Sequence, residues 1–148
     1  MYALETGKFS SNQRTDEQAE IKKLRKRDQE VRAHEQAHIA AAGGLAKGGA
    51  AFSFQRGADG KQYAVGGEVN IDTSPVSGNP EATIQKAKQI RAAALAPADP
   101  SAQDRAVAAS ASALEAQAQQ ELQKEKQEAS ASSDEDAPGT FPRIDLFA

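Results

Sequence analysis

The spacing of apolar residues divides this chain into a long helix, a β-hairpin and two further helices. In residues 15–42 apolar positions recur three, four or seven residues apart, which is typical of one face of an α-helix. That face contains Ile21, Leu24, Val31, His38 and Ala42. Thr15 to Gln18 has the composition of a capping box, and Gly43-Gly44 provides the left-handed residue that often ends a helix. We therefore predict a helix over residues 15–42.

The next segment changes to a period of two. Phe52 and Phe54 alternate with polar residues, Tyr63 and Val65 do the same, and residues 57–60 between them are rich in turn formers. This pattern predicts a β-hairpin with a four-residue turn. A pair of glycines then interrupts the second strand, and a shorter alternating segment follows it.

The remaining ordered segments read as two helices. Asn79-Pro80 is a favourable helix start, with a capping residue followed by proline at the first helical position. Asp99-Pro100 repeats this pattern, and a second apolar stripe follows it: Val107, Ala111, Leu114, Ala118 and Leu122. We expect an α+β, mainly helical fold in which residues 15–128 form a single domain. Residues 1–14 are predicted to be a disordered N-terminal arm, and residues 129–148 a disordered tail rich in Ser, Ala and Asp.

Composition limits the classes of function. The chain has 148 residues, enough for one modest domain, and 31 of its apolar residues are alanine, so the core is small. A net charge of −3 gives no indication of nucleic-acid binding, and the basic run at residues 22–27 is better explained as a solvated face with a pair such as Asp28–Arg32. Absence of cysteine excludes disulfides and thiol nucleophiles. No secretory leader or membrane-spanning run is evident, so we expect a cytoplasmic protein without membrane insertion.

The two histidines of the chain both lie in the first predicted helix. His34-Glu35-Gln36-Ala37-His38 has the H-E-x-x-H pattern, in which two imidazoles one helical turn apart bind zinc and the glutamate acts as general base. The apolar stripe leads into the histidine face, which favours burial of that face. Arg32 is an unusual neighbour, but on a helix it lies about 160° from His34 and can point away from a metal. The alternative explanation is two partly exposed histidines with Glu35 in local ion pairs.

A catalytic zinc ion needs a third protein ligand, and here it must be a carboxylate because the chain has no further histidine and no cysteine. Glu68 is the first choice, since the preceding glycine pair allows the backbone to approach the motif helix closely. Asp72 is the second candidate, on the same side of the predicted strand. Glu81 and Asp104 follow, because acids at a helix N-terminus already have a simpler role there.

Several blocks of the chain together resemble the bacterial metalloprotease family also called the SprA-related family. The blocks are residues 31–38, 63–72, 80–84 and 96–104, and the resemblance spans about residues 28 to 122. It implies a zincin-like metallopeptidase domain with His34 and His38 as zinc ligands and Glu35 as the catalytic acid. A third ligand at Glu68 fits the Gly-Gly-Glu block.

We therefore predict a Zn²⁺-dependent peptidase acting on a peptide or protein substrate. Zinc held by His34, His38 and Glu68 would activate a water molecule, and Glu35 would accept its proton. The hairpin at residues 52–65 is a candidate edge against which an extended substrate aligns. The competing hypothesis is a non-catalytic helical interaction module, metal-stabilised or metal-free, because the small core and the Ala- and Gln-rich third helix suit docking onto a partner. The oligomeric state is left open.

Overall fold

The computed structural model describes residues 2–136, with side chains from residue 11 to residue 132. Its helices are α1 (Tyr2–Ala42), α2 (Pro80–Ala94) and α3 (Ala102–Asp136), with a short 3₁₀ turn η1 (Gly43–Leu45) after α1. Strands β1 (Ala51–Arg56) and β2 (Gln62–Glu68) form an antiparallel hairpin. The described part of the chain is therefore mainly helical with one hairpin, as the sequence predicts.

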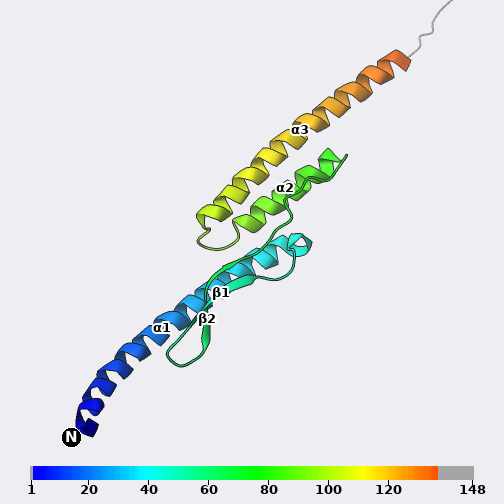
Figure 1. The fold of residues 1–148 in the computed structure, drawn as a ribbon. Coiled ribbons are helices and arrows are strands. Elements are labelled where there is room, and N and C mark those ends of the chain that lie inside the picture. The colour runs from blue at the N-terminus through cyan, green and yellow to red at the C-terminus, as the bar shows by residue number, and fades with distance from the viewer. Residues whose placement is uncertain (1, 137–148) are drawn as a thin grey trace, which may run out of the picture.

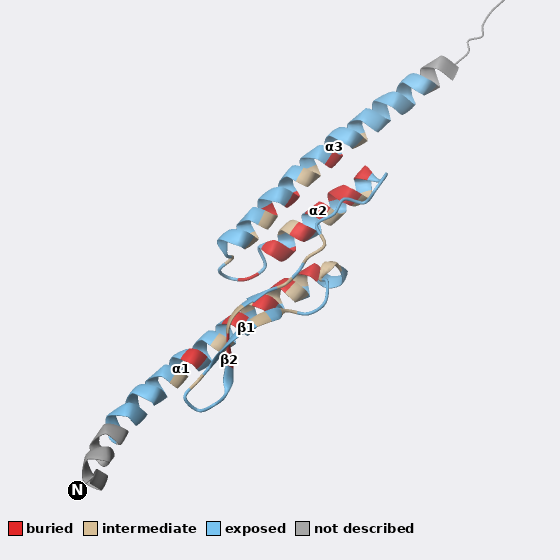
Figure 2. Ribbon diagram, in the orientation of Figure 1, coloured by how far each residue is buried: buried red, intermediate tan, exposed pale blue. Residues whose placement is uncertain are grey.

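The hairpin lies along the C-terminal half of α1, and α2 and α3 lie side by side on the other side of that half (Figure 1). The far ends of α1 and α3 extend away from this central region in opposite directions. Figure 2 shows that buried residues concentrate in the central region and that the described parts of both extensions are largely exposed. None of the helices within residues 2–136 has an apolar stretch long enough to cross a bilayer.

Several helix boundaries follow from local capping, as expected. The helix α1 ends at Ala42, and Gly43 adopts a φ of 54°, a conformation that is favourable for glycine. At the start of α2 the Asn79 side chain accepts a hydrogen bond from the N–H of Ala82 at 3.0 Å, and Pro80 is the first helical residue. These two boundaries confirm the sequence interpretation.

Two boundaries differ from expectation. The helix α1 begins at Tyr2, ahead of Thr15. The Thr15 hydroxyl donates backward to the Ser11 carbonyl at 3.1 Å inside this helix and does not cap a new one. The helix α3 begins at Ala102, after Ser101, and not at Pro100. Helix also covers residues 2–14 and 129–136, where the sequence predicts disorder, while residues 137–148 lie outside the described residues.

The hairpin is attached to α1 through the outer edge of β2. Asp28 accepts a hydrogen bond from the N–H of Ala64 at 2.8 Å, and the Nε of Arg27 donates to the carbonyl of Val65 at 3.3 Å. Ala64 is completely buried beneath these contacts. Beyond β2 the ladder continues through an isolated bridge between Ala46 and Ile71. The segment after β2 is thereby held beside the chain that follows η1.

Candidate metal centre

His34 and His38 project from one face of α1, one turn apart. Their Nε2 atoms lie 3.2 Å from each other. His38 is buried at 3% exposure, because α2 covers it, whereas His34 is partly exposed. Arg32 points elsewhere, since its guanidinium pairs with Asp28 and lies 5.1 Å from the centre of the Phe52 ring. The motif helix thus presents two imidazoles to a common point, with the neighbouring cation turned away.

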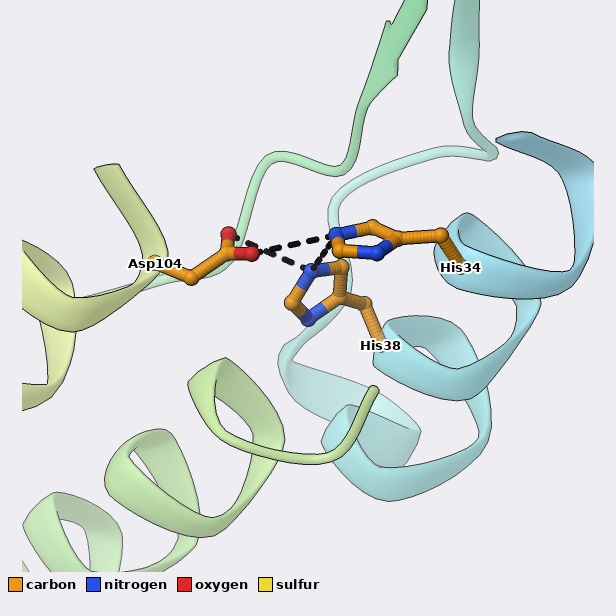
Figure 3. A group of neighbouring side chains, drawn as sticks. All are labelled: His34, His38 and Asp104. Carbon is orange, nitrogen blue, oxygen red and sulfur yellow. Dashed lines mark hydrogen bonds and ion pairs between the residues drawn. The ribbon is translucent and has the colours of Figure 1, made fainter. Parts of the chain in front are cut away.

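Asp104 of α3 completes this group. Its Oδ2 lies 3.1 Å from the Nε2 of His34, and its Oδ1 lies 3.2 Å from the Nε2 of His38 (Figure 3). Ser101 positions the carboxylate through the reciprocal bonds of a capping box: the N–H of Ser101 donates to Oδ2 at 2.8 Å, and the N–H of Asp104 donates to the Ser101 hydroxyl at 3.1 Å. One ligand atom from each of the two histidines and Asp104 lies within 4.8 Å of the others.

The other three carboxylates that the sequence proposed lie elsewhere. Glu68, the last residue of β2, is exposed and is not part of the group formed by His34, His38 and Asp104. Asp72 accepts hydrogen bonds from Ser74 and pairs with Lys86 at 3.0 Å. These interactions hold the pKa of Asp72 well below the usual range. Glu81 is exposed in the first turn of α2, where it borders a separate hollow. The structure thus brings together the histidines and the acid that the sequence ranked last.

Asp104 ranked last among the four carboxylates predicted from the sequence, because its position at a helix N-terminus already explained an acid there. The available signal was Ser101-Ala102-Gln103-Asp104, which has capping-box spacing and makes Ser101 the cap in place of Asp99. That reading places Asp104 in the first turn of α3, pointing back across the connection from α2. The contact with α1 still depends on how α2 and α3 fold back, which no local pattern contains.

The hydrogen bonds of His38 favour a cation in the centre of the group. Its Nδ1 lies 2.8 Å from the carbonyl of Ala93, an acceptor only, so this nitrogen carries the proton and donates. The Nε2 of a neutral His38 is then unprotonated, yet it lies 3.2 Å from an oxygen of Asp104. Two lone pairs at this distance repel unless a proton or a metal ion lies between them. Two imidazole nitrogens and a carboxylate are ligands that zinc accepts, so the group can hold a metal ion.

Glu35 is the second unusual group in this region. Its side chain is buried at 4% exposure, and Oε2 has no hydrogen-bond partner among the described residues. Burial raises the pKa of Glu35; the nearby histidines oppose this, and the charges of Asp104 and Glu68 add to it. A buried carboxylate oxygen without a partner is costly, which indicates that a ligand or water normally completes its bonding.

Glu35 is enclosed because β2 passes very close to it. A Cβ atom placed on Gly67 would lie 2.9 Å from the Cγ of Glu35, closer than real Cβ atoms approach, and 3.0 Å from the Cδ1 of Phe52, which is unusually tight. Gly67 therefore does allow the close approach to the motif helix that the sequence suggested. Its consequence is to bury Glu35, and Glu68 stays at the exposed side.

We refer to His34, His38 and Asp104 as the metal group. The metal group and Glu35 line one open cleft of about 1200 Å³. Its walls are the C-terminal half of α1, the segment from Gly66 to Thr73, and the connection between α2 and α3 with the first turns of α3. The cleft thus joins two ligands from α1 to one from α3, beside a buried acid and a strand. This arrangement has the components for metal-assisted hydrolysis of a bound polymer or small molecule.

Comparison with known proteins identifies the family. No curated protein and no solved structure matches this chain. The model of the SprA-related family matches residues 6–138, which include α2, the hairpin, the cleft and all residues of the metal group. Because the match covers most of the 148 residues, the chain belongs to the SprA-related family.

Proposed function

We propose that this protein is a zinc-dependent peptidase that hydrolyses a peptide bond in the cleft between α1 and α3. The observation that carries the proposal is the convergence of His34, His38 and Asp104 beside the buried, unpartnered carboxylate of Glu35. Three protein ligands leave one position open for water or substrate, which is characteristic of catalytic zinc sites. Structural zinc sites have four protein ligands, which this group lacks within the described residues.

The ion would be held by His34, His38 and Asp104. Two residues outside this shell would orient the ligands: the Ala93 carbonyl orients His38, and Ser101 orients Asp104. Hydrogen bonds of this second layer fix the tautomer of an imidazole and the rotation of a carboxylate. When bound, zinc would lower the pKa of a water molecule toward about 7 and polarise the scissile carbonyl.

Glu35 would act as the general base and then as the proton donor to the leaving amine. Its buried position raises its pKa, and a base works best when its pKa is near the operating pH. On the helix it is about 60° from His38 around the axis, so it flanks the ligand face and need not bind the ion. Its unpartnered Oε2 is then the atom that accepts the proton of the attacking water.

The strand segment after β2 would bind the backbone of the substrate. Ala46 and Ile71 form a bridge flanked by the bonds from Lys47 to Asn70 and from Asp72 to Leu45. In such a non-hydrogen-bonded pair, the N–H and C=O of Ile71 point away from Ala46. They are available to an extended peptide, which would pair with this edge as an added strand. This segment lines the cleft directly, downstream of the hairpin residues that the sequence favoured for this role.

The test is zinc content and peptidase activity of four proteins: wild type, Glu35→Gln, Asp104→Ala and Glu68→Gln. We expect wild type and Glu35→Gln to bind one zinc each, and Glu35→Gln to lose peptidase activity. Asp104→Ala should lower zinc affinity by about 100-fold or more, since even outer-shell changes cost about 10–100-fold. Glu68→Gln should retain it.

Loss of zinc binding in Glu68→Gln, with Asp104→Ala unaffected, would restore the original assignment of Glu68 as third ligand. A wild-type protein that binds no zinc would refute the proposal. Stoichiometric zinc without hydrolysis of any peptide would favour the competing hypothesis, a metal-stabilised interaction module. The exposed extensions of α1 and α3 provide the surface that such a module would use.

A further inference from the structure

The cleft has an excess of negative charge that the metal group does not explain. Five carboxylates line it, and the single guanidinium among its lining residues belongs to Arg27. These charges leave an excess of four negative charges, which exceeds the net −3 of the whole chain. A divalent cation bound by the metal group would still leave an excess of two negative charges in the cleft.

Three of these carboxylates have no role in the proposed chemistry. Glu30 lies one turn before His34 on α1, Glu68 ends β2, and Asp99 lies in the connection between α2 and α3. All three line the cleft and are exposed, and they come from three different parts of the chain. Among the described residues none of their three side chains has a hydrogen bond or an ion pair. We refer to Glu30, Glu68 and Asp99 as the acidic rim.

Two further features indicate that the negative charge of the acidic rim serves to bind a ligand. The Nε of Arg27 donates to the carbonyl of Val65, so the nearest cation is engaged with the hairpin. Inside the cleft the buried Glu35 has an oxygen without a partner among the described residues, and a polar group of a ligand can complete its bonding. Acids placed around such a cleft attract cations and repel anions before contact occurs.

We propose that the acidic rim binds an ammonium or guanidinium group of the substrate next to the scissile bond. The cation is either a Lys or Arg side chain or the α-amino group of the peptide. This inference rests on the proposed function for the position of the scissile bond, but the binding of the cation is a separate property of the cleft and can be measured without turnover.

The experiment measures peptide binding by fluorescence anisotropy to zinc-loaded Glu35→Gln protein. Three peptides of equal length are compared: an N-acetylated peptide with one central Lys, the same peptide with Gln in place of Lys, and the Gln peptide with a free N-terminus. We expect a cationic peptide to bind more tightly than the acetylated Gln peptide by on the order of tenfold, since each exposed charge pair contributes about two- to fivefold. The advantage should vanish at about 1 M salt, where the Debye length is about 3 Å.

A matched pair of triple variants separates the rim from overall charge. Glu30→Gln with Glu68→Gln and Asp99→Asn removes the rim, and Asp16→Asn with Glu17→Gln and Glu20→Gln makes the same charge change on the exposed part of α1. Both sets are made in the Glu35→Gln protein. The rim set should abolish the preference for cationic peptides, and the control set should retain it.

The pattern of peptides identifies the source of the cation. Preference for the Lys peptide assigns the rim to a side chain, and preference for the free N-terminus assigns it to an α-amino group. Equal binding of all three peptides, no measurable binding of any, or a preference that survives loss of the rim would overturn the inference. If the cationic peptide binds preferentially but wild type never cleaves it, the proposed function fails and the rim inference stands.

Discussion

At the scale of single residues, the position of Glu35 depends on Gly67. The absence of a side chain at Gly67 lets β2 approach α1 so closely that Glu35 is buried with one oxygen unpartnered. Gly66, one residue earlier, has ordinary surroundings: a Cβ there would lie 3.8 Å from the nearest atom, the Cβ of Ser53. The two glycines look equivalent in the sequence but have different surroundings in the fold.

This difference predicts opposite outcomes for two neighbouring substitutions. Gly67→Ala places a methyl group against Glu35 and Phe52, so it should lower the free energy of unfolding by about 1–3 kcal/mol and reduce any peptidase activity by displacing Glu35. Gly66→Ala should be neutral or stabilise by about 0.5 kcal/mol, because it restricts the unfolded chain. Urea denaturation and activity of both variants provide the measurement. Equal stability of the two proteins would contradict the close approach at Gly67.

At the scale of elements, the hairpin depends on α1 for its stability. An isolated two-stranded hairpin is marginal in water, and this one has mostly exposed residues on β1. Asp28 and Arg27 bind the free edge of β2, so the motif helix and the strand that lines the cleft are held in a fixed relation. The hydrogen bond from the Ala64 N–H lowers the pKa of Asp28, burial opposes this, and the guanidinium of Arg32 adds to the lowering.

Asp28→Ala leaves the buried N–H of Ala64 without its acceptor and should cost about 1–3 kcal/mol of stability at about pH 7. Because the pKa of Asp28 is lower in the folded protein, its contribution is present above the unfolded value of about 3.9 and is lost as pH falls through the folded value. The stability difference from wild type should therefore shrink in acid. Thermal unfolding between about pH 7 and pH 3 measures this. Asp16→Ala, an exposed site on the same helix, should stay within about 0.5 kcal/mol of wild type.

At the scale of the whole molecule, the metal group links two halves. One half is α1 with the hairpin, and the other is α2 with α3 (Figure 1). The helix α3 packs along α2, and α2 packs on α1, so Asp104 is the place where α3 binds directly to the motif helix. An ion bound here would add a bridge between the halves of a domain whose core is mostly alanine.

Excess zinc is therefore expected to raise the melting temperature of the wild-type protein. At a free concentration about 100 times the dissociation constant, the stabilisation is about 2.7 kcal/mol, which corresponds to roughly 5–10 °C for a domain of this size. Asp104→Ala should lose most of this shift, and Glu68→Gln should retain it. Calorimetry with and without a chelator provides the measurement. An equal shift in wild type and Asp104→Ala would show that the ion binds without joining α3 to α1.

The sequence by itself determined the elements and the two histidines of the site. The end of α1 at Gly43, the start of α2 at Asn79 and the hairpin depend on neighbours a few residues apart, so local patterns predict them. The position of His34 and His38 on the same face of α1, one turn apart, follows from helical geometry alone. The same local logic was insufficient at Thr15, where the hydroxyl had two alternative uses and bonds backward within a continuous helix.

Only the tertiary structure decided which carboxylate joins the histidines. Asp104 is 70 residues from His34, and its approach depends on α3 packing back along α2 and on Ser101 orienting the carboxylate. Glu68 had the better local argument, because Gly67 before it does approach the motif helix closely, but that approach buries Glu35 and leaves Glu68 exposed. Two properties depend on contacts between distant parts of the chain: which face of a strand is buried, and how the helices pack on one another. They are set by burial of the small apolar core, which no spacing along the chain specifies.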